Sequence, residues 1–404
     1  MKILCVLGEH NYGNPARGAG YEYVNFIPSL RSLGHDVSHF ESFSRVEFHN
    51  FAELNGKLLE RVKAERPDMI FFVLLGYEVW LETLALIREG SDAILVNWAT
   101  DDSWKYEQHS RFIASAFDLY VTTYQEALTK AINAGASNFY LSQWAINGLS
   151  LKEPLPAQDC KYQVSFVGTC YGNRRHWITK LANLGVKVEC FGFGWPGGPI
   201  PHNMVSEIIR NSVINLNFGD SGIQWNKFLP TKSRQIKARL FEVSGMGGCL
   251  MTEPATGLED FFQLGHELVT FSSVEELARK LTFYLNKPEE RDRIAQAGHL
   301  RVALDHTYEV RFTALLEAAV QRRRPPTGQE IDLKKFMAIA KRHEIGFSLT
   351  LFRMLLVFPC ILLWGKARGP RAARRFLLEA SWRLMGRHTY TAGGWPGRLF
   401  YCES

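Results

Sequence analysis

The sequence predicts an α/β fold of two doubly wound parallel-sheet domains, each Rossmann-like, followed by a helical extension at the C-terminus. The first observation behind this prediction is that apolar runs of strand length alternate with amphipathic helical segments through most of the 404 residues. The second is a proline-bearing polar stretch at 149–162, which interrupts the alternation as a linker would. We therefore expect domains at 1–150 and 151–318, and an extension at 319–404.

Composition narrows the classes of function. A net charge of +6 with a pI near 8.8 favours an anionic partner, such as a diphosphate, a nucleic acid or an acidic membrane face. Nucleic acid is disfavoured, because the basic residues gather beside an apolar tail and do not alternate with base-stacking aromatic residues. The seven cysteines are scattered without a CxxC pair, so we expect reduced thiols and no metal site. No cofactor is expected, and because no cleavage site follows the first apolar run we expect a cytoplasmic location.

The first domain is expected to begin with a buried parallel strand. The near-continuous apolar run at 2–7 predicts a strand covered on both faces and is too short for a signal peptide. Further strands are expected at 36–40, 69–75, 93–98, 119–122 and 140–143, and helices from residue 21 and at 51–65, 78–88, 109–116 and 125–134.

Two loops of this domain follow strands and are candidate ligand-binding segments, because open α/β sheets bind ligands at the carboxyl ends of their strands. One is the glycine-rich loop from Gly8 to Gly20, whose spacing is not the GxGxxG of a dinucleotide site and also suits a flexible surface loop. The other holds Asp101 and Asp102. Adjacent carboxylates ligate Mg²⁺, orient an acceptor hydroxyl or act as a base. The alternative is that one of them caps the next helix and the other is solvated.

The second domain repeats the alternation. Strands are expected at 163–167, 186–191, 213–217, 249–252 and 268–271, helices at 174–184, 204–211, 258–262, 274–285 and 288–304, and an irregular loop at 218–230. Arg174 and Arg175 fall in the first turn of a helix, where cations are unfavourable unless an anion is bound. The pair is therefore a candidate phosphate contact, with a solvated basic face as the alternative.

The segment 235–253 is the main functional candidate. Lys237 and Arg239 come first, Glu242 follows on a short apolar helix, and a glycine-rich turn beginning at Gly245 leads into a strand. A helix start with cations beside it holds a diphosphate, because free N–H groups and the helix dipole both favour negative charge. A carboxylate on the same helix accepts two hydrogen bonds from a ribose or sugar diol. Together these features suit a nucleotide-sugar, although an ordinary αβ connection has a similar composition.

Five segments carry a family resemblance: NWATDDSW (97–104), VSFVGTCYGNRR (164–175), FGFGW (191–195), KARLFEVSGMGGCLMTE (237–253) and HTYEVRF (306–312). Together they resemble the CgeB-like, spore-maturation-type glycosyltransferases, members of the GT-B superfamily, in which two Rossmann-like domains face a cleft. The resemblance covers about residues 1–316. It implies metal-independent transfer of a sugar from a nucleotide-sugar, held mainly by the second domain, to an acceptor against the first.

The resemblance also implies roles for single residues. Glu242 would hold the donor ribose, Arg239 and Lys237 the diphosphate, and Asp101 and Asp102 would be the acceptor-side acids. The resemblance also places Gly8 and its loop under the donor. The predicted donor site comprises Gly8, Gly168 in the turn after the strand at 163–167, Arg174, Arg175, Lys237, Glu242 and Gly245, and the predicted catalytic residues are Asp101, Asp102 and Arg239.

One position departs from the pattern. Retaining GT-B enzymes often carry a second glutamate in an E-x7-E pair, and the matching position here is Arg234. The donor sugar and the stereochemical outcome are therefore left open. Two other functions also fit: a GT-B protein that binds nucleotides or glycans without catalysis, and an enzyme that hydrolyses or isomerises nucleotide-sugars.

The C-terminal extension combines an apolar run at 345–364 with seven basic residues between 366 and 387. Arg353 and Pro359 interrupt the run and disfavour a full membrane span. An in-plane apolar helix backed by a basic amphipathic one would dock through 345–388 on the anionic inner face of a membrane. The alternative is a helical pair packed on the second domain. Docking would suit a lipid-linked acceptor, while a glycan or protein acceptor stays open.

Overall fold

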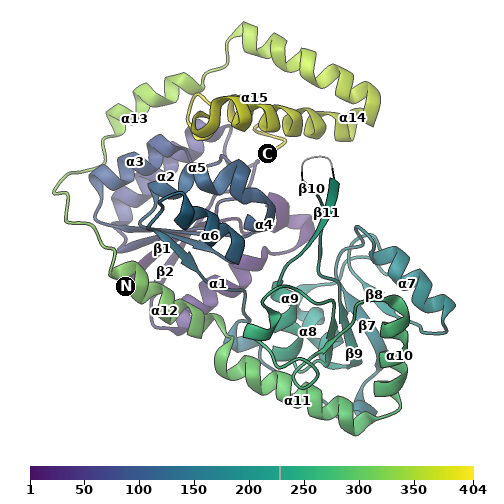
Figure 1. Cartoon of the computed structure of the whole chain (residues 1–404). Coiled ribbons are helices and arrows are strands. Elements are labelled where there is room, and N and C mark those ends of the chain that lie inside the picture. Colours follow the sequence, from purple (N-terminus) through teal and green to yellow (C-terminus); the bar gives the residue numbers. More distant parts are fainter. Residues whose placement is uncertain (227–228) are drawn as a thin grey trace. The chain divides into compact units, whose positions relative to one another are not determined.

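The computed structural model describes residues 1–226 and 229–404, and the side chains in these ranges except those of 202 and 220–233. The chain forms two compact units (Figure 1). The first unit comprises 1–143 and 314–404, and the second comprises 144–313. The division falls within helix α12 (Tyr308–Val320), so the C-terminal extension belongs to the first unit.

The first unit contains a six-stranded parallel sheet in the order β2-β1-β3-β4-β5-β6. Its strands are β1 (Lys2–Leu7), β2 (Asp36–Glu41), β3 (Met69–Phe72), β4 (Ile94–Ala99), β5 (Leu119–Thr122) and β6 (Phe139–Leu141). Four of them, β1, β3, β4 and β5, are buried along nearly their whole length. This burial explains why they appear in the sequence as continuous apolar runs.

Helices connect these strands, and local signals set several of their ends. They are α1 (Tyr21–Ser32), α2 (Phe51–Glu65), α3 (Leu81–Gly90), α4 (Asp102–Lys105), α5 (Arg111–Ile113) and α6 (Gln125–Asn133). Helix α2 begins where Asn50 accepts a hydrogen bond from the Glu53 N–H. Helix α3 begins three residues later than predicted, because the buried Glu78 carboxylate accepts the N–H groups of Leu75 and Gly76 in the turn before it.

The second unit contains a five-stranded parallel sheet in the order β13-β12-β9-β7-β8. The strands are β7 (Tyr162–Val167), β8 (Glu189–Phe191), β9 (Ser212–Asn217), β12 (Leu250–Thr252) and β13 (Val269–Thr270). The helices are α7 (Arg174–Asn183), α8 (His202–Arg210), α9 (Ala238–Gly245), α10 (Val274–Leu285) and α11 (Pro288–Asp305).

The irregular loop predicted at 218–230 is wrong. An antiparallel hairpin, β10 (Asp220–Asn226) and β11 (Leu229–Arg234), occupies most of this segment. Gly222 and Pro230 suggested a loop in the sequence. A two-stranded hairpin tolerates such residues, because both of its strands are edge strands.

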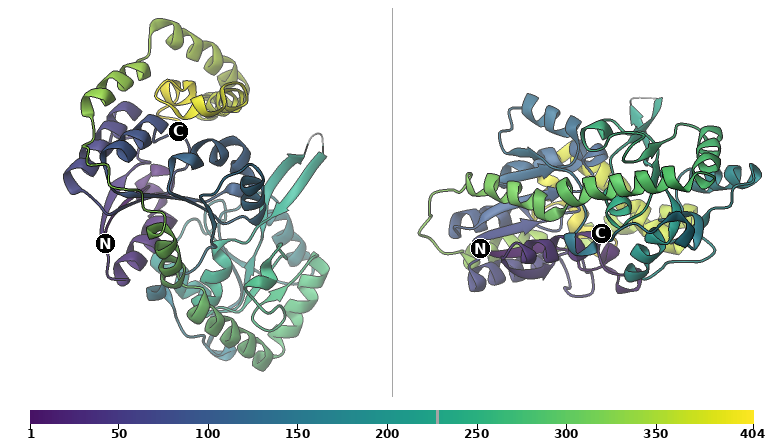
Figure 2. Two further views of the ribbon diagram at one scale, coloured as in Figure 1. Left: turned by 60° about the vertical axis from the view of Figure 1, so that its left-hand side comes forward. Right: turned by 90° about the horizontal axis from the view of Figure 1, so that it is seen from below.

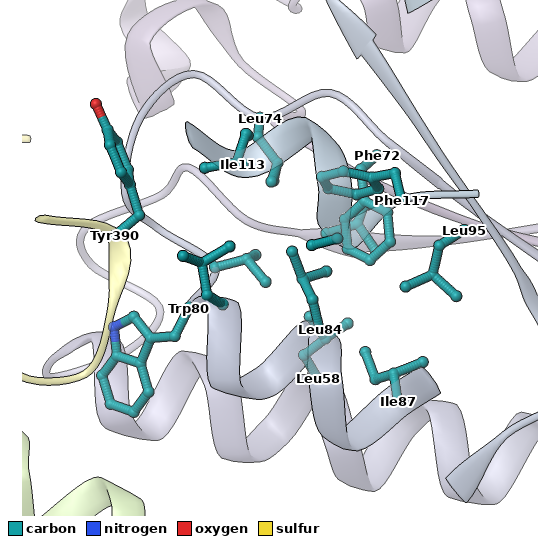
Figure 3. Close-up of a cluster of buried hydrophobic side chains, with 14 of the residues drawn as sticks. Leu58, Phe72, Leu74, Trp80, Leu84, Ile87, Leu95, Ile113, Phe117 and Tyr390 are labelled. Atoms are coloured by element: carbon teal, nitrogen blue, oxygen red, sulfur yellow. The ribbon is translucent and has the colours of Figure 1, made fainter. Parts of the chain in front are cut away.

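The C-terminal extension completes the core of the first unit. It contains α13 (Leu333–Ala340), α14 (Phe347–Met385) and α15 (Trp395–Leu399). Phe336 stacks on Trp80 with ring centroids 6.1 Å apart, and Tyr390 is buried in the same apolar cluster (Figure 3). The expected alternative, a helical pair packed on the second domain, is wrong, because the structure groups α14 with the first unit and Leu378 of α14 packs against this same cluster.

Helix α14 is a hairpin of two helical arms (Figures 1 and 2). The break is at Gly365, whose φ of +77° lies in the left-handed region that favours glycine. The arms pack closely, because a Cβ at Gly369 would lie 2.6 Å from the backbone nitrogen of Ile361. We call residues 347–364 the first arm and residues 366–385 the second arm.

Candidate functional site

The candidate donor site lies at the carboxyl edge of the second sheet. Strand β7 ends at Val167 and is followed by the loop 168–173 and helix α7. Strand β9 ends at Asn217, and the chain passes through the β10–β11 hairpin into α9 before it forms β12. Both helices follow the carboxyl ends of parallel strands, so their N-termini face the edge where α/β sheets bind ligands.

A tyrosine hydroxyl connects the two helix starts. Lys237, the N-cap residue of α9, donates from Nζ to the Tyr171 hydroxyl at 3.0 Å. Arg174, the first residue of α7, donates from Nη2 to the same hydroxyl at 3.0 Å. The Arg174 guanidinium also lies 4.0 Å from the Tyr171 ring centroid. The structure thus brings together two predicted phosphate contacts that are 63 residues apart in the sequence.

The first turns of α7 and α9 contain no acidic residue. Two neighbouring helices of the second unit begin differently: α10 has a Ser273 cap followed by two glutamates, and α11 has two glutamates in its first turn. Acidic residues at those starts complement the helix dipole. At α7 and α9 basic side chains stand in their place, and the Lys237 ammonium cannot accept a hydrogen bond from first-turn amides. Both helix starts are therefore suited to an external anion.

Arg174 and Arg175 differ in their surroundings. Arg174 is buried and donates to the carbonyls of Thr169 at 2.8 Å and Phe218 at 3.3 Å. It therefore holds the loop after β7 against the end of β9. Arg175 is exposed and donates to the Gly194 carbonyl at 2.8 Å. Of the predicted pair, Arg175 is the more accessible cation.

Two of the three predicted glycines, Gly168 and Gly245, make close packing contacts in the second unit. Gly168 donates its N–H to the Phe191 carbonyl at 2.8 Å and accepts the Trp195 indole N–H at 2.8 Å. Gly245 is buried, and a Cβ there would lie 2.8 Å from the Ile146 side chain. The structure explains both glycines by backbone hydrogen bonding and steric fit.

Arg239 and Glu242 form an ion pair on α9. Arg239 Nη1 lies 3.1 Å from Glu242 Oε2, one helical turn away, and the Glu242 side chain is only 7% exposed. This pairing balances a buried carboxylate, which would otherwise be costly to ionise. It also fixes the side chain predicted to hold the donor ribose.

Arg234, the position of the absent second glutamate, faces a carboxylate from another strand end. Arg234 Nη2 lies 3.2 Å from Glu253 Oε1, and Glu253 Oε2 accepts the Gly219 N–H at 2.9 Å. An open pocket of about 430 Å³ is lined by Arg234 and by residues 254–256, directly after β12. An acidic side chain therefore lies beside Arg234 at this edge, a feature that the E-x7-E spacing alone would not reveal.

In the first unit, Asp101 and Asp102 have different environments. Asp102 is 3% exposed and accepts a hydrogen bond from the Ser110 hydroxyl, and burial raises the pKa of its carboxyl group. Asp101 is the N-cap residue of α4, its side chain is partly exposed, and its Oδ2 lies 3.5 Å from Lys105 Nζ. The structure therefore makes Asp101 the accessible acid and Asp102 a buried one.

Sequence reasoning missed Glu22. This residue lies in the first turn of α1, directly after the glycine-rich loop. Burial, with a smaller contribution from Asp101, raises the pKa of Glu22 to about 7. A carboxyl group with a pKa near the working pH suits general base catalysis. The only signal in the sequence was an acidic residue at a helix start, which is common.

The loop that begins at Gly8 is held from its base. The Glu41 carboxylate accepts the backbone N–H groups of Glu9, Phe43 and Ser44. Glu9, His10 and Glu41 place ligand atoms within 4.8 Å of one another, as a metal site would. Because Glu41 already binds three amides, we interpret this cluster as a support for the loop.

Comparison with solved structures identifies the fold. A sucrose-phosphate synthase from Thermosynechococcus elongatus is 12% identical, with a TM-score of 0.53 over 80% of this chain and 99% of that one. Anabaena HepE, solved with UDP and glucose, is 12% identical, with a TM-score of 0.54 over the same shares. An alpha-glucosyltransferase, solved with UDP-glucose and abasic-site DNA, is 10% identical, with a TM-score of 0.58 over 79% of this chain and 99% of that one.

The chain has the GT-B fold. The predicted fold class is confirmed, including both parallel sheets and the helical C-terminal segment. Residues 174–317 match a family described as glycosyl transferase-like. No curated protein sequence matches the chain. The matched segment begins at Arg174 and contains α9, so it includes most of the donor-site residues described above.

Proposed function

We propose that the protein is a glycosyltransferase that moves a sugar from a nucleotide-sugar to an acceptor hydroxyl. One observation carries the proposal: two acid-free helix starts meet at Tyr171, with Lys237 and Arg174 beside them, on a GT-B fold. Two solved neighbours contain UDP with glucose or UDP-glucose, so UDP-hexoses are the donors to test first. Membership of the CgeB-like branch stays a prediction from the sequence motifs.

The second unit would stabilise the leaving group. In the reaction the bond between the anomeric carbon and the diphosphate oxygen breaks, and its electron pair stays on that oxygen. Lys237 and the first amides of α9 and α7 would hold the growing negative charge, while Glu242 would accept hydrogen bonds from the ribose diol. Arg239 would act mainly by fixing Glu242, with which it is paired at 3.1 Å.

The first unit would supply the acceptor side. The acceptor oxygen forms the new bond to the anomeric carbon and loses its proton to a base. Asp101 and Glu22 are the candidates, since Asp101 is accessible and the pKa of Glu22 is raised to about 7. If Glu22 is the base, kcat/KM should rise with pH across this value, and Glu22→Gln should remove that rise. An unchanged pH profile in the variant would exclude Glu22.

The direct test is turnover of nucleotide-sugars by the purified full chain. UDP-, GDP- and TDP-sugars are screened first by thermal shift, because a ligand at a hundred times its Kd stabilises a protein by about 2.7 kcal/mol. Release of the nucleoside diphosphate is then measured with and without candidate glycan, lipid-linked and protein acceptors. Release that depends on an acceptor supports transfer. Release without an acceptor, accompanied by free sugar, supports the hydrolase. An isomerised nucleotide-sugar, formed without net release of the nucleoside diphosphate, supports the isomerase.

A second candidate function is nucleotide or glycan binding without catalysis. The observation that favours it is Arg234, which stands where retaining enzymes carry an acid and is occupied by an ion pair with Glu253. Tight binding of a nucleotide-sugar, with neither release of nucleoside diphosphate nor an isomerised product for any donor or acceptor, would establish this alternative.

We place this activity in the cytoplasm. The seven cysteines, all in described parts of the chain, are free thiols in the structure. Reduced thiols fit a reducing compartment, which supports this placement without testing it. Fractionation of cells that express the full chain would test it directly.

A further inference from the structure

The first arm of α14 presents an apolar face to solvent. Large exposed side chains recur there at helical spacing: Phe347, Leu351, Met354, Leu355, Phe358 and Leu362. Residues spaced by three and four lie on one side of a helix, so these side chains form a single stripe. All residues of the arm are described, and its single charged side chain, Arg353, is partly exposed and lies on the other side of the helix from the stripe. Soluble monomers rarely expose such a continuous patch without a partner.

The opposite side of the arm is attached to the protein. Val357 and Cys360 are buried against Leu399 and Phe400. Arg353, which interrupts the apolar run in the sequence, donates to the Leu399 carbonyl at 2.8 Å and to Glu403 at 2.5 Å. Its charge therefore lies on the attached side and leaves the exposed stripe uninterrupted.

The hydropathy of α14 is that of a lipid-contacting helix. Its most apolar window of 18 residues has a mean hydropathy of 2.0, and only 11% of that window is buried within the protein. A helix this long and apolar is able to cross a membrane by length and composition. A buried core helix passes the same test, but here the apolar residues are exposed.

The basic charge of the protein is concentrated beside this stripe. Residues 341–388 contain ten Lys or Arg and two acidic residues, a net charge of +8. The whole chain has a net charge of +6, so the rest of the chain is net −2. On the second arm, Arg368, Arg371 and Arg375 are exposed at helical spacing and lie on one face. At the tip between the arms, Leu363 and Trp364 are exposed as well.

We propose that the α14 hairpin docks in the plane of an anionic lipid surface. The stripe of the first arm enters the boundary between headgroups and acyl chains, and the arginines of the second arm contact anionic headgroups. The combination of an uncharged apolar stripe with a local excess of eight positive charges favours lipid over a second copy of this net-basic chain. The proposal does not depend on the proposed sugar transfer.

Two features favour in-plane docking over a span. The chain reverses at Gly365, so the apolar stretch is limited to the 18 residues of the first arm. At 1.5 Å per residue this arm is about 27 Å long, slightly less than the hydrocarbon core of a bilayer. A span would also require Arg353 to leave the Leu399 carbonyl and Glu403 and enter hydrocarbon.

The test is vesicle flotation of the full-length protein. Vesicles of phosphatidylcholine alone are compared with vesicles that also contain the anionic lipid phosphatidylglycerol, at low and high salt. The wild type should float with the anionic vesicles, less with the neutral ones, and less as salt rises. Replacement of Phe358 and Leu362 by serine should abolish flotation. Arg371→Gln with Arg375→Gln should weaken anionic binding about 25-fold, at roughly fivefold per charge removed.

Two control variants match these changes elsewhere. Leu304→Ser removes an equally exposed leucine from α11, and Lys187→Gln removes an exposed cation from the second unit. Both should float like the wild type. Because all the altered side chains are exposed, circular dichroism and thermal unfolding should show folded protein in every case.

Three results would overturn the proposal. The first is a folded wild type that does not float with anionic vesicles at low salt. The second is a serine variant that floats as well as the wild type. The third is a wild type that does not bind lipid but forms dimers, while the serine variant stays monomeric. The stripe would then be an interface between copies of the chain. None of these results bears on nucleotide-sugar binding, so failure here and failure of the proposed function are separable.

Discussion

Replacing Lys237 by methionine should separate nucleotide binding from folding. The side chain is partly exposed at the start of α9, and its Nζ donates to the Tyr171 hydroxyl at 3.0 Å. This hydrogen bond joins a solvated ammonium to a neutral hydroxyl, and water takes its place when it is lost, so its removal costs the folded protein about 1 kcal/mol or less. A hydrogen bond from a cation to a phosphate is worth about 2 kcal/mol, roughly thirtyfold in Kd. Affinity for UDP should therefore fall far more than stability.

Thermal unfolding with UDP gives the size of this effect. At a UDP concentration of a hundred times the wild-type Kd, the ligand stabilises the wild type by about 2.7 kcal/mol. With a thirtyfold weaker Kd, the same concentration stabilises the variant by only about 0.9 kcal/mol. Isothermal titration should give the same Kd ratio.

Lys180→Met is the matched control. Lys180 is an exposed cation on α7, six residues beyond Arg174 and so about 9 Å along the helix axis from the proposed site. It removes the same charge from the same unit and should leave the Kd of UDP unchanged. If Lys237→Met bound UDP with wild-type affinity, or if both variants lost affinity equally, the assignment of a phosphate to the start of α9 would be refuted.

Three further predictions follow from the site and the core. Glu242→Gln removes the charged partner of Arg239 and should destabilise the second unit by about 1–2 kcal/mol, as measured by denaturant titration. The same change should weaken the binding of a nucleoside more than the binding of pyrophosphate. Glu22 has a folded pKa of about 7, above the ordinary 4.5, so the folded state keeps a proton that the unfolded chain releases, and stability should fall as pH rises through this window. Glu22→Gln should be more stable than the wild type at pH 8 and as stable as the wild type near pH 4. If the unfolding free energies of the variant and the wild type changed with pH in the same way, this prediction would be contradicted. Phe336→Ala removes the ring that stacks on Trp80 and should lower the free energy of unfolding of the first unit by about 3–5 kcal/mol. In calorimetry, the unfolding transition of the first unit should move to lower temperature, while the transition that UDP stabilises should not move.

The sequence predicts the two sheets well because the signals involved are local. Parallel strands buried on both faces give continuous apolar runs, and helix α10 matches its expected range residue for residue because Ser273 is a recognisable cap. The sequence does not predict the hairpin β10–β11, because its strands lack apolar alternation and include Pro230. Its stability depends on pairing between strands, which a local pattern does not reveal.

The candidate site was predictable in part. Lys237 and Arg174 stood out because cations at helix starts oppose the dipole, and the structure places them on one hydroxyl. The difference between Asp101 and Asp102, and the raised pKa of Glu22, result from burial, which depends on the folded chain and not on the local sequence pattern. The same limit applies to Phe336, whose contact with Trp80 joins residues more than 250 positions apart. Periodicity identifies the apolar face of a helix but not its partner.

The first unit is discontinuous along the chain, and this has a consequence for its synthesis. Its sheet leaves the ribosome early, but Phe336 and Tyr390, which fill its core, are translated only after the whole second unit. The second unit is contiguous and is free to fold during that interval. Nascent chains should therefore pass through a stage in which the sheet of the first unit has an uncovered apolar flank around Trp80. Slow translation in that interval should increase chaperone binding and aggregation, and ribosome-bound chains of increasing length should become protease-resistant first at 144–313.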